Sequence, residues 1–252
     1  MAATAVVLPQ AMAFGVALLV PAGIDPASGA LAGLIGAASL SLCSGLSGGT
    51  PGLISAPTGP TLVLQAGVVA ALAGNGLDTA GVLTGMALVI LLTGVFQALI
   101  GLSGGGRLIK YIPYPVVAGF MTGSAILMVL SQIDPLSGEG YTTAWSGWRW
   151  VVPVTAAFTY ACMSLVPRWL PMVPGTIAGL IGGTLLFQLL VQLGPAAVPG
   201  PWVIGTLPGL ESVHVGLETA AIRELPLRII LLSSLALAVL ASLDTLLTSV
   251  IA

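Results

Sequence analysis

The placement of the charged residues constrains this sequence more than any other feature. The chain has 252 residues with 8 acidic and 6 basic side chains, and long stretches carry none of them: 1–24, 26–77, 79–106, 111–133, 150–167 and 169–210. An apolar helix needs about 20 residues to cross a bilayer core, so the stretch 26–77 alone is long enough for two crossings. Runs of this length predict an all-α, polytopic membrane protein.

The composition excludes the common soluble classes. Hydrophobic residues make up 57% of the chain and charged residues 6%, whereas soluble domains carry about 25% charged residues. A net charge of −2 offers no basic face for nucleic acid. The single histidine, His214, falls in a connector, so no predicted span holds a histidine to activate a nucleophile, and we predict no enzymatic activity. Cys43 and Cys162 lie in apolar runs, which indicates buried packing residues rather than a disulfide or a metal pair.

The apolar runs predict eight membrane crossings, separated by connectors rich in proline and glycine. We expect them at residues 3–20, 27–46, 56–74, 79–101, 114–133, 150–166, 174–194 and 227–250. Gly29 and Gly33, and likewise Gly119 and Gly123, have the spacing that lets helix backbones approach closely in lipid. We interpret both pairs as packing within one subunit, with a dimerisation face as the alternative.

Basic residues predict the orientation of the chain. Arg107, Lys110 and Arg168 fall in two connectors on the same side of the membrane, and the positive-inside rule makes that side cytoplasmic. Three further arginines fall on the opposite side, one of them among the glutamates of the long connector 195–226 and one just after that connector. On balance the N-terminus is predicted to be cytoplasmic.

The third predicted span is interrupted where a continuous helix would be expected. Residues 55–61 read Ser-Ala-Pro-Thr-Gly-Pro-Thr, and two prolines with a glycine do not sustain a helix there. A helix from Thr61 to Ala73 would be about 20 Å long, which is too short for a core of about 30 Å. We therefore expect a half-helix that begins near mid-membrane, where its N-terminal amides and dipole form an anion site. The alternative is a loop between two spans.

Asp244 lies deep in the last apolar run, and an intramembrane carboxylate is costly and usually functional. Thr248 follows four residues later, so both oxygens face the same way on a helix. Carboxylate and hydroxyl oxygens suit a hard cation, and two interpretations stay open: the pair binds sodium, or Asp244 carries a proton. If the span ended early, Asp244 would instead lie at the interface.

The first span carries Pro9 and Gln10, followed one turn later by Phe14. Proline frees a backbone carbonyl, and the Gln10 amide adds a donor and an acceptor at lipid depth. A kinked helix whose glutamine bonds to a neighbouring helix explains the same residues equally well.

Several of these segments, in order, resemble the SulP family of inorganic anion transporters, the sulfate permease type. The resemblance rests on residues 8–14 (LPQAMAF), 49–51 (GTP), 56–61 (APTGPT), 111–123 (YIPYPVVAGFMTG) and 242–250 (SLDTLLTSV). Within that family the chain most resembles the sodium-dependent bicarbonate transporters of cyanobacteria.

The resemblance implies a fold of seven plus seven spans in two inverted repeats, followed by a cytoplasmic STAS domain. In these terms residues 1–194 are the first repeat, 195–226 an outer connector and 227–252 the first span of the second repeat. We expect a chain that stops there to be an incomplete transport domain of a longer protein. The resemblance also implies a bacterial inner membrane, a homodimer for the complete protein, and a block with spans one, three and eight that moves against spans five to seven.

The resemblance assigns roles to individual residues. Gln10, Phe14, Thr58, Gly59 and Thr61 would form the anion site. Asp244 and Thr248 would hold the sodium ion, and no other cofactor is expected. The predicted function is secondary active transport of bicarbonate or sulfate, with sodium coupling favoured. The alternatives are a nucleobase permease of the same fold, and an anion channel or non-transporting membrane subunit.

Overall fold

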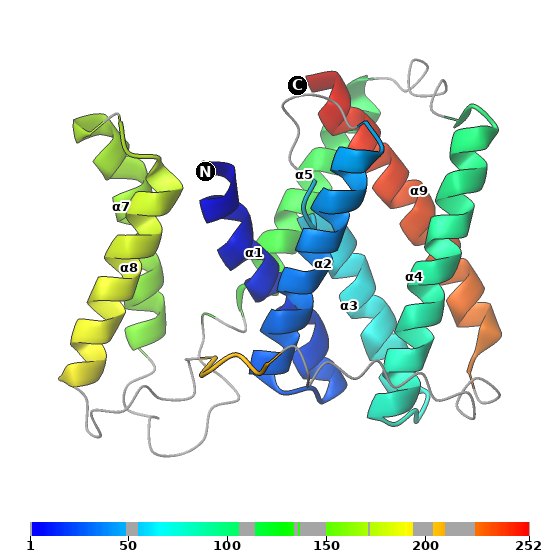
Figure 1. Ribbon diagram of the computed structural model, residues 1–252, viewed down its shortest axis with the longest axis horizontal. Helices are drawn as coiled ribbons and strands as arrows, with labels where there is room; N and C mark the ends of the chain where they lie inside the picture. Colours follow the sequence, from blue (N-terminus) through cyan, green and yellow to red (C-terminus); the bar gives the residue numbers. More distant parts are fainter. Residues whose placement is uncertain are drawn as a thin grey trace. The chain divides into compact units, whose positions relative to one another are not determined.

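The charge-free runs fold into helices. The computed structural model describes residues 2–48, 55–105, 114–133, 136, 150–170, 172–193, 204–209 and 225–251. The helical elements in these ranges, shown in Figure 1, are α1 (Ala2–Leu19), η1 (Val20–Ala22), α2 (Pro26–Leu46), α3 (Gly59–Gly74), α4 (Thr79–Leu102), α5 (Tyr114–Ser131), α7 (Val151–Trp169), α8 (Gly175–Gln192) and α9 (Leu227–Ile251).

Each of the eight predicted crossings contains one α-helix, so the all-α architecture is confirmed. In the described part of the chain, five helices are long and apolar enough to cross a membrane: Pro26–Leu46, Thr79–Leu102, Val151–Trp169, Gly175–Gln192 and Leu227–Leu246. Shorter apolar helices cover Val7–Ala22, Gly59–Gly74 and Met121–Leu130. Leu, Val and Ala dominate these helices, and capping Asp residues begin α2 and α4.

The contacts divide the chain into two units, and each is discontinuous in sequence. The smaller unit combines Met1–Pro9 with Val129–Thr206 and contains α7 and α8. The larger unit combines Gln10–Met128 with Leu207–Ala252 and contains α2, α3, α4, α9 and most of α1 and α5. Span five, expected to group with spans six and seven, falls mostly in the larger unit. The division expected from the sequence, into a first repeat at 1–194, a connector at 195–226 and a further span at 227–252, follows chain order and not contacts. It stays a prediction.

Glycines set the close packing of α7 against α8. A Cβ added at Gly179 would overlap the Met163 side chain, and one added at Gly183 would overlap the Thr159 hydroxyl. Gly182 faces the thiol of Cys162, whose partial burial agrees with a packing role. Cys43 is exposed instead, so its predicted burial is wrong: the Cys43 face of α2 is not covered by described residues.

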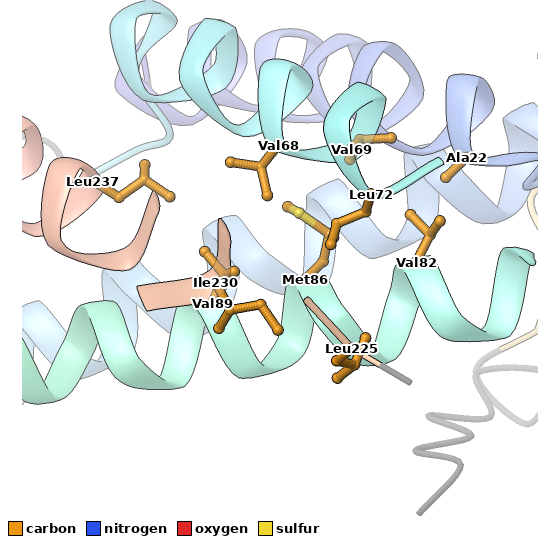
Figure 2. Close-up of a cluster of buried hydrophobic side chains, with 10 residues drawn as sticks. All are labelled: Ala22, Val68, Val69, Leu72, Val82, Met86, Val89, Leu225, Ile230 and Leu237. Atoms are coloured by element: carbon orange, nitrogen blue, oxygen red, sulfur yellow. The ribbon is translucent and has the colours of Figure 1, made fainter. Parts of the chain in front are cut away.

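The core of the larger unit lies where α3, α4 and α9 meet. Figure 2 shows its members, which also include one residue of η1 and one that precedes α9: Ala22, Val68, Val69, Leu72, Val82, Met86, Val89, Leu225, Ile230 and Leu237. The Thr93 hydroxyl adds a polar link, since it donates to the carbonyl of Val89 at 2.7 Å and reaches that of Ser234 on α9 at 3.3 Å. In lipid such close packing, rather than the loss of water contact, stabilises helix association. This core fixes the position of α3.

Helices α1 and α2 cross with their backbones in contact. A Cβ added at Gly15 would overlap the carbonyl of Gly29, and one added at Gly33 would overlap the carbonyl of Ala11. Glycine is therefore required at this crossing, as the spacing of Gly29 and Gly33 predicted. The second predicted pair differs, because a Cβ added at Gly119 on α5 would meet no described atom within 4 Å.

Candidate functional site

The predicted break in span three is present in the structure. Residues 55–58 have no regular structure, and α3 begins at Gly59, after Thr58 with φ −109° and ψ 153°. The helix starts two residues before the predicted Thr61, because Pro60 falls in its first turn, where proline costs no hydrogen bond and presets φ. At 16 residues, α3 is about 24 Å long and shorter than a bilayer core of about 30 Å.

The first turn of α3 presents amides and hydroxyls together. The first bond of the helix joins the Leu62 N–H to the Thr58 carbonyl at 3.1 Å, so the N–H groups of Gly59 and Thr61 have no acceptor within the helix, and Pro60 has no N–H. The Thr61 hydroxyl donates to the Thr58 carbonyl at 2.8 Å, and the two threonine hydroxyls lie 3.1 Å apart. Thr61 therefore supports the turn, and the hydroxyl that can turn toward a ligand is that of Thr58.

Two side chains from other helices reach this turn. Gln10 on α1 donates a long hydrogen bond of 3.5 Å from Nε2 to the Pro57 carbonyl, so the structure brings Gln10 to the segment that precedes α3. Met128 on α5 packs against Gly59, which is buried: a Cβ added at Gly59 would overlap the Met128 sulfur and lie 2.7 Å from its Cγ. Phe14 is partly buried on α1, one turn after Gln10. Its predicted role in the pocket stays a prediction.

Asp244 lies on α9, the helix that packs on both α3 and α4. Its side chain is 8% exposed, and among the described residues Asp244 is the charged residue that is buried. The helix continues to Ile251, so it does not end at Asp244. Thr248 lies one turn further along the same helix, and its side chain is outside the described residues.

Serine residues of α2 are the members of this region that the sequence analysis missed. The Ser55 hydroxyl donates to the Ser44 hydroxyl at 2.6 Å, and the Ser41 hydroxyl donates to the Ser55 carbonyl at 3.0 Å. The sequence feature that could have indicated them is the pair Ser41 and Ser44, three residues apart in an apolar helix. Single serines of this kind commonly bond to their own helix, so the pair did not stand out.

A groove on α7 and α8 carries none of the predicted site residues. Its lining is Val152, Thr155, Ala156, Thr159, Tyr160, Met163 and Phe187. The hydroxyls of Thr155 and Thr159 both donate to carbonyls of α7 itself, at 2.7 and 2.8 Å. The groove is therefore mainly apolar and unsuited to a small anion.

Comparisons with known proteins agree with this arrangement. The family model described as "Sulfate permease family" matches residues 1–252. The chain is 30% identical over 241 residues to the bicarbonate transporter BicA of Synechocystis sp., an alignment that covers 89% of this chain and 40% of that protein. It is 28% identical over 247 residues to the putative sulfate transporter YbaR of Bacillus subtilis, covering 96% of this chain and 44% of that protein.

A solved structure shares the fold. The transmembrane domain of a cyanobacterial bicarbonate transporter BicA matches with a TM-score of 0.73 and 29% identity, covering 99% of this chain and 62% of that chain. That domain has the inverted-repeat fold, so the predicted transporter architecture is confirmed. The chain spans less than half the length of the two curated relatives, at 40% and 44%.

Proposed function

The chain belongs to the sulfate permease family, a family of anion transporters, and from this premise we propose that its complete polypeptide carries a small inorganic anion, bicarbonate or sulfate, by secondary active transport coupled to sodium. The names of the relatives, bicarbonate transporter and putative sulfate transporter, support the substrate class. The membership and the apolar helices make it a multi-pass integral membrane protein. We further propose a bacterial inner membrane, a cytoplasmic N-terminus and a homodimer.

The observation that carries the proposal is the start of α3. A half-helix directs the amides of Gly59 and Thr61 and the positive end of its dipole toward one place, and this suits an oxyanion without any cationic side chain. The Thr58 hydroxyl adds a neutral donor. Both bicarbonate and sulfate carry oxygens that accept such bonds, so the substrate is proposed as this class of ion.

Asp244 supports the coupling part of the proposal. A buried carboxylate is costly in a membrane and usually functional, and a cation that binds there offsets part of that cost. Asp244 and Thr248 stand one turn apart on α9, and carboxylate and hydroxyl oxygens suit a hard cation. Because α9 packs on α3, cation binding on one helix acts on the helix that holds the anion.

The test is uptake of labelled bicarbonate and labelled sulfate into proteoliposomes that contain the complete polypeptide, with and without an inward sodium gradient. We expect accumulation of one anion, driven by sodium. Competition by uracil instead of by small anions would indicate a nucleobase permease. Currents that only follow the electrochemical gradient would indicate a channel, and the absence of any flux would indicate a non-transporting subunit.

Asp244→Asn removes the charge at the proposed cation site. We expect concentrative uptake to fall by about 10- to 100-fold, the cost of losing one charged ligand, while the protein remains in the membrane. Asp25→Asn is the matched control, because Asp25 caps α2 through its side-chain oxygen and asparagine retains an oxygen there. Full sodium-driven uptake by the Asp244→Asn protein would contradict the cation site.

A further inference from the structure

In the segment 55–58, the carbonyls of residues 55–57 lie outside any helix, and the Thr58 carbonyl accepts the first bond of α3. At membrane depth an unsatisfied carbonyl costs several kcal/mol, so irregular backbone persists there only where protein or water satisfies it. Side chains from three helices provide this. Ser41 of α2 bonds to the Ser55 carbonyl, Gln10 of α1 to the Pro57 carbonyl and Thr61 of α3 to the Thr58 carbonyl.

Helix α2 holds the beginning of this segment twice. Ser41 donates to the Ser55 carbonyl, and Ser44 accepts from the Ser55 hydroxyl at 2.6 Å. Ser41 and Ser44 are three residues apart and share one helix face. The Ser39 hydroxyl, by contrast, donates to the Ile35 carbonyl of its own helix at 2.8 Å. The contact is therefore specific to one face of α2.

The support beneath the segment is stiff. The backbones of α1 and α2 are in contact through Gly15, Gly29 and Gly33. Gln10 on α1 and the two serines on α2 therefore lie on a pair of helices that are packed tightly together. Thr58 and Gly59 directly follow the held segment. A shift of the segment therefore moves the donors at the start of α3 relative to the ligand.

From this geometry we infer that Ser41, Ser44 and Ser55 are positioning residues of the anion site: they act through residues 55–58 and set the affinity for the anion without touching it. The inference rests on the proposed function. Donors must be held to within about 0.5 Å for tight recognition, and the two hydrogen bonds of these serines at the beginning of the segment provide that constraint.

The experiment measures anion uptake as a function of concentration for the complete polypeptide in proteoliposomes. Ser44→Ala and Ser55→Ala should each raise KM for the anion by about three- to tenfold, the value of one neutral hydrogen bond, with the maximal velocity unchanged. The double variant should be no worse than either single variant, because both remove the same bond. Ser44→Thr should restore KM, and Ser39→Ala should match the wild type.

Unchanged KM in both alanine variants would overturn the inference, and so would a fall in maximal velocity alone, which indicates a merely structural role. Hydrogen exchange of residues 55–62 in the purified protein provides a readout independent of transport. Ser44→Ala should speed exchange there, and Ser39→Ala should not. If the wild type carries neither bicarbonate nor sulfate, the proposed function fails, but the exchange experiment still decides whether the serines hold the segment. Unchanged exchange in Ser44→Ala would show that they do not.

Discussion

Helices α3 and α4 follow each other in the chain and share one apolar core, yet they begin in opposite ways. The 24-residue α4 starts at an exposed Asp78, whose carboxylate accepts from the Gly81 N–H at 2.8 Å. The 16-residue α3 starts after an extended segment, and the Thr58 hydroxyl bonds to the Thr61 hydroxyl instead of to a backbone amide. The positive end of α4 therefore has a carboxylate of its own chain, and the positive end of α3 has no side-chain cap.

The contrast extends to α2, where Asp25 accepts from Ala27 and Ser28 at 3.0 and 3.3 Å. A missing cap alone does not mark a site, because α7 and α8 also begin without a side-chain cap. What distinguishes α3 is its extended lead-in, which side chains of α1 and α2 hold in place. At α3, polar side chains of neighbouring helices therefore shape the segment before the helix, whereas at α2 and α4 an acidic cap occupies the first amides.

The largest expected effect comes from making α3 begin as α4 does. Thr58→Asp places a carboxylate at the N-cap, where it should stabilise the helix by up to about 1 kcal/mol and abolish anion uptake by occupying the same amides and repelling the substrate. Uptake and thermal unfolding of the same preparation measure both effects. Asp78→Asn on α4 is the control and should leave uptake unchanged. Wild-type uptake by Thr58→Asp would remove the start of α3 from the site.

A smaller effect follows from removing one donor. Thr58→Val keeps the shape of the side chain and loses its hydroxyl, so the apparent affinity for the anion should weaken by about three- to tenfold. Uptake measured over a range of anion concentrations gives this value. Thr184→Val on α8, whose hydroxyl bonds only to Leu180 of its own helix among the bonds described, should match the wild type. An unchanged KM for Thr58→Val would exclude Thr58 as a ligand.

The smallest expected effect is on stability, and the test is whether a glycine-to-alanine change in α3 lowers or raises it. Gly59→Ala must displace the Met128 side chain, which is flexible and 40% exposed, at a cost of about 1 kcal/mol. Gly67→Ala in the same helix meets open space and should instead stabilise by up to about 1 kcal/mol. Thermal unfolding in detergent compares the two. Met128→Ala should remove the penalty at Gly59, and equal stability of the two glycine variants would contradict the contact.

Much of the fold could be predicted because a bilayer restricts what an apolar run can do. The break before α3 was predictable from Pro57, Gly59 and Pro60, since these residues oppose a helix interior regardless of their neighbours. The burial of Asp244 agrees with its position deep in an apolar run. These features are local, and local chemistry can be read in the sequence.

The partners of the site could not be predicted in the same way. Met128 lies far along the chain from Gly59, and nothing in a run of apolar residues indicates which one faces a glycine of another helix. The bonds of Ser41 and Ser44 to Ser55 depend equally on how α2 packs beside the segment. The open surroundings of Gly119 show the same limit, because spacing predicts which backbones can approach but not which do.

The crossing of α1 and α2 has a consequence for the order in which the protein assembles. These helices are joined by a tight turn in which Gly23 takes a φ of 87°, so they form a hairpin that is synthesised before α3. The later α3 has a proline-containing lead-in and too little length to span the bilayer alone. We expect the hairpin to insert into the membrane before α3 and to act as a template for it. A weakened glycine crossing would then cause α3 to fail to insert, before any defect in transport could be measured.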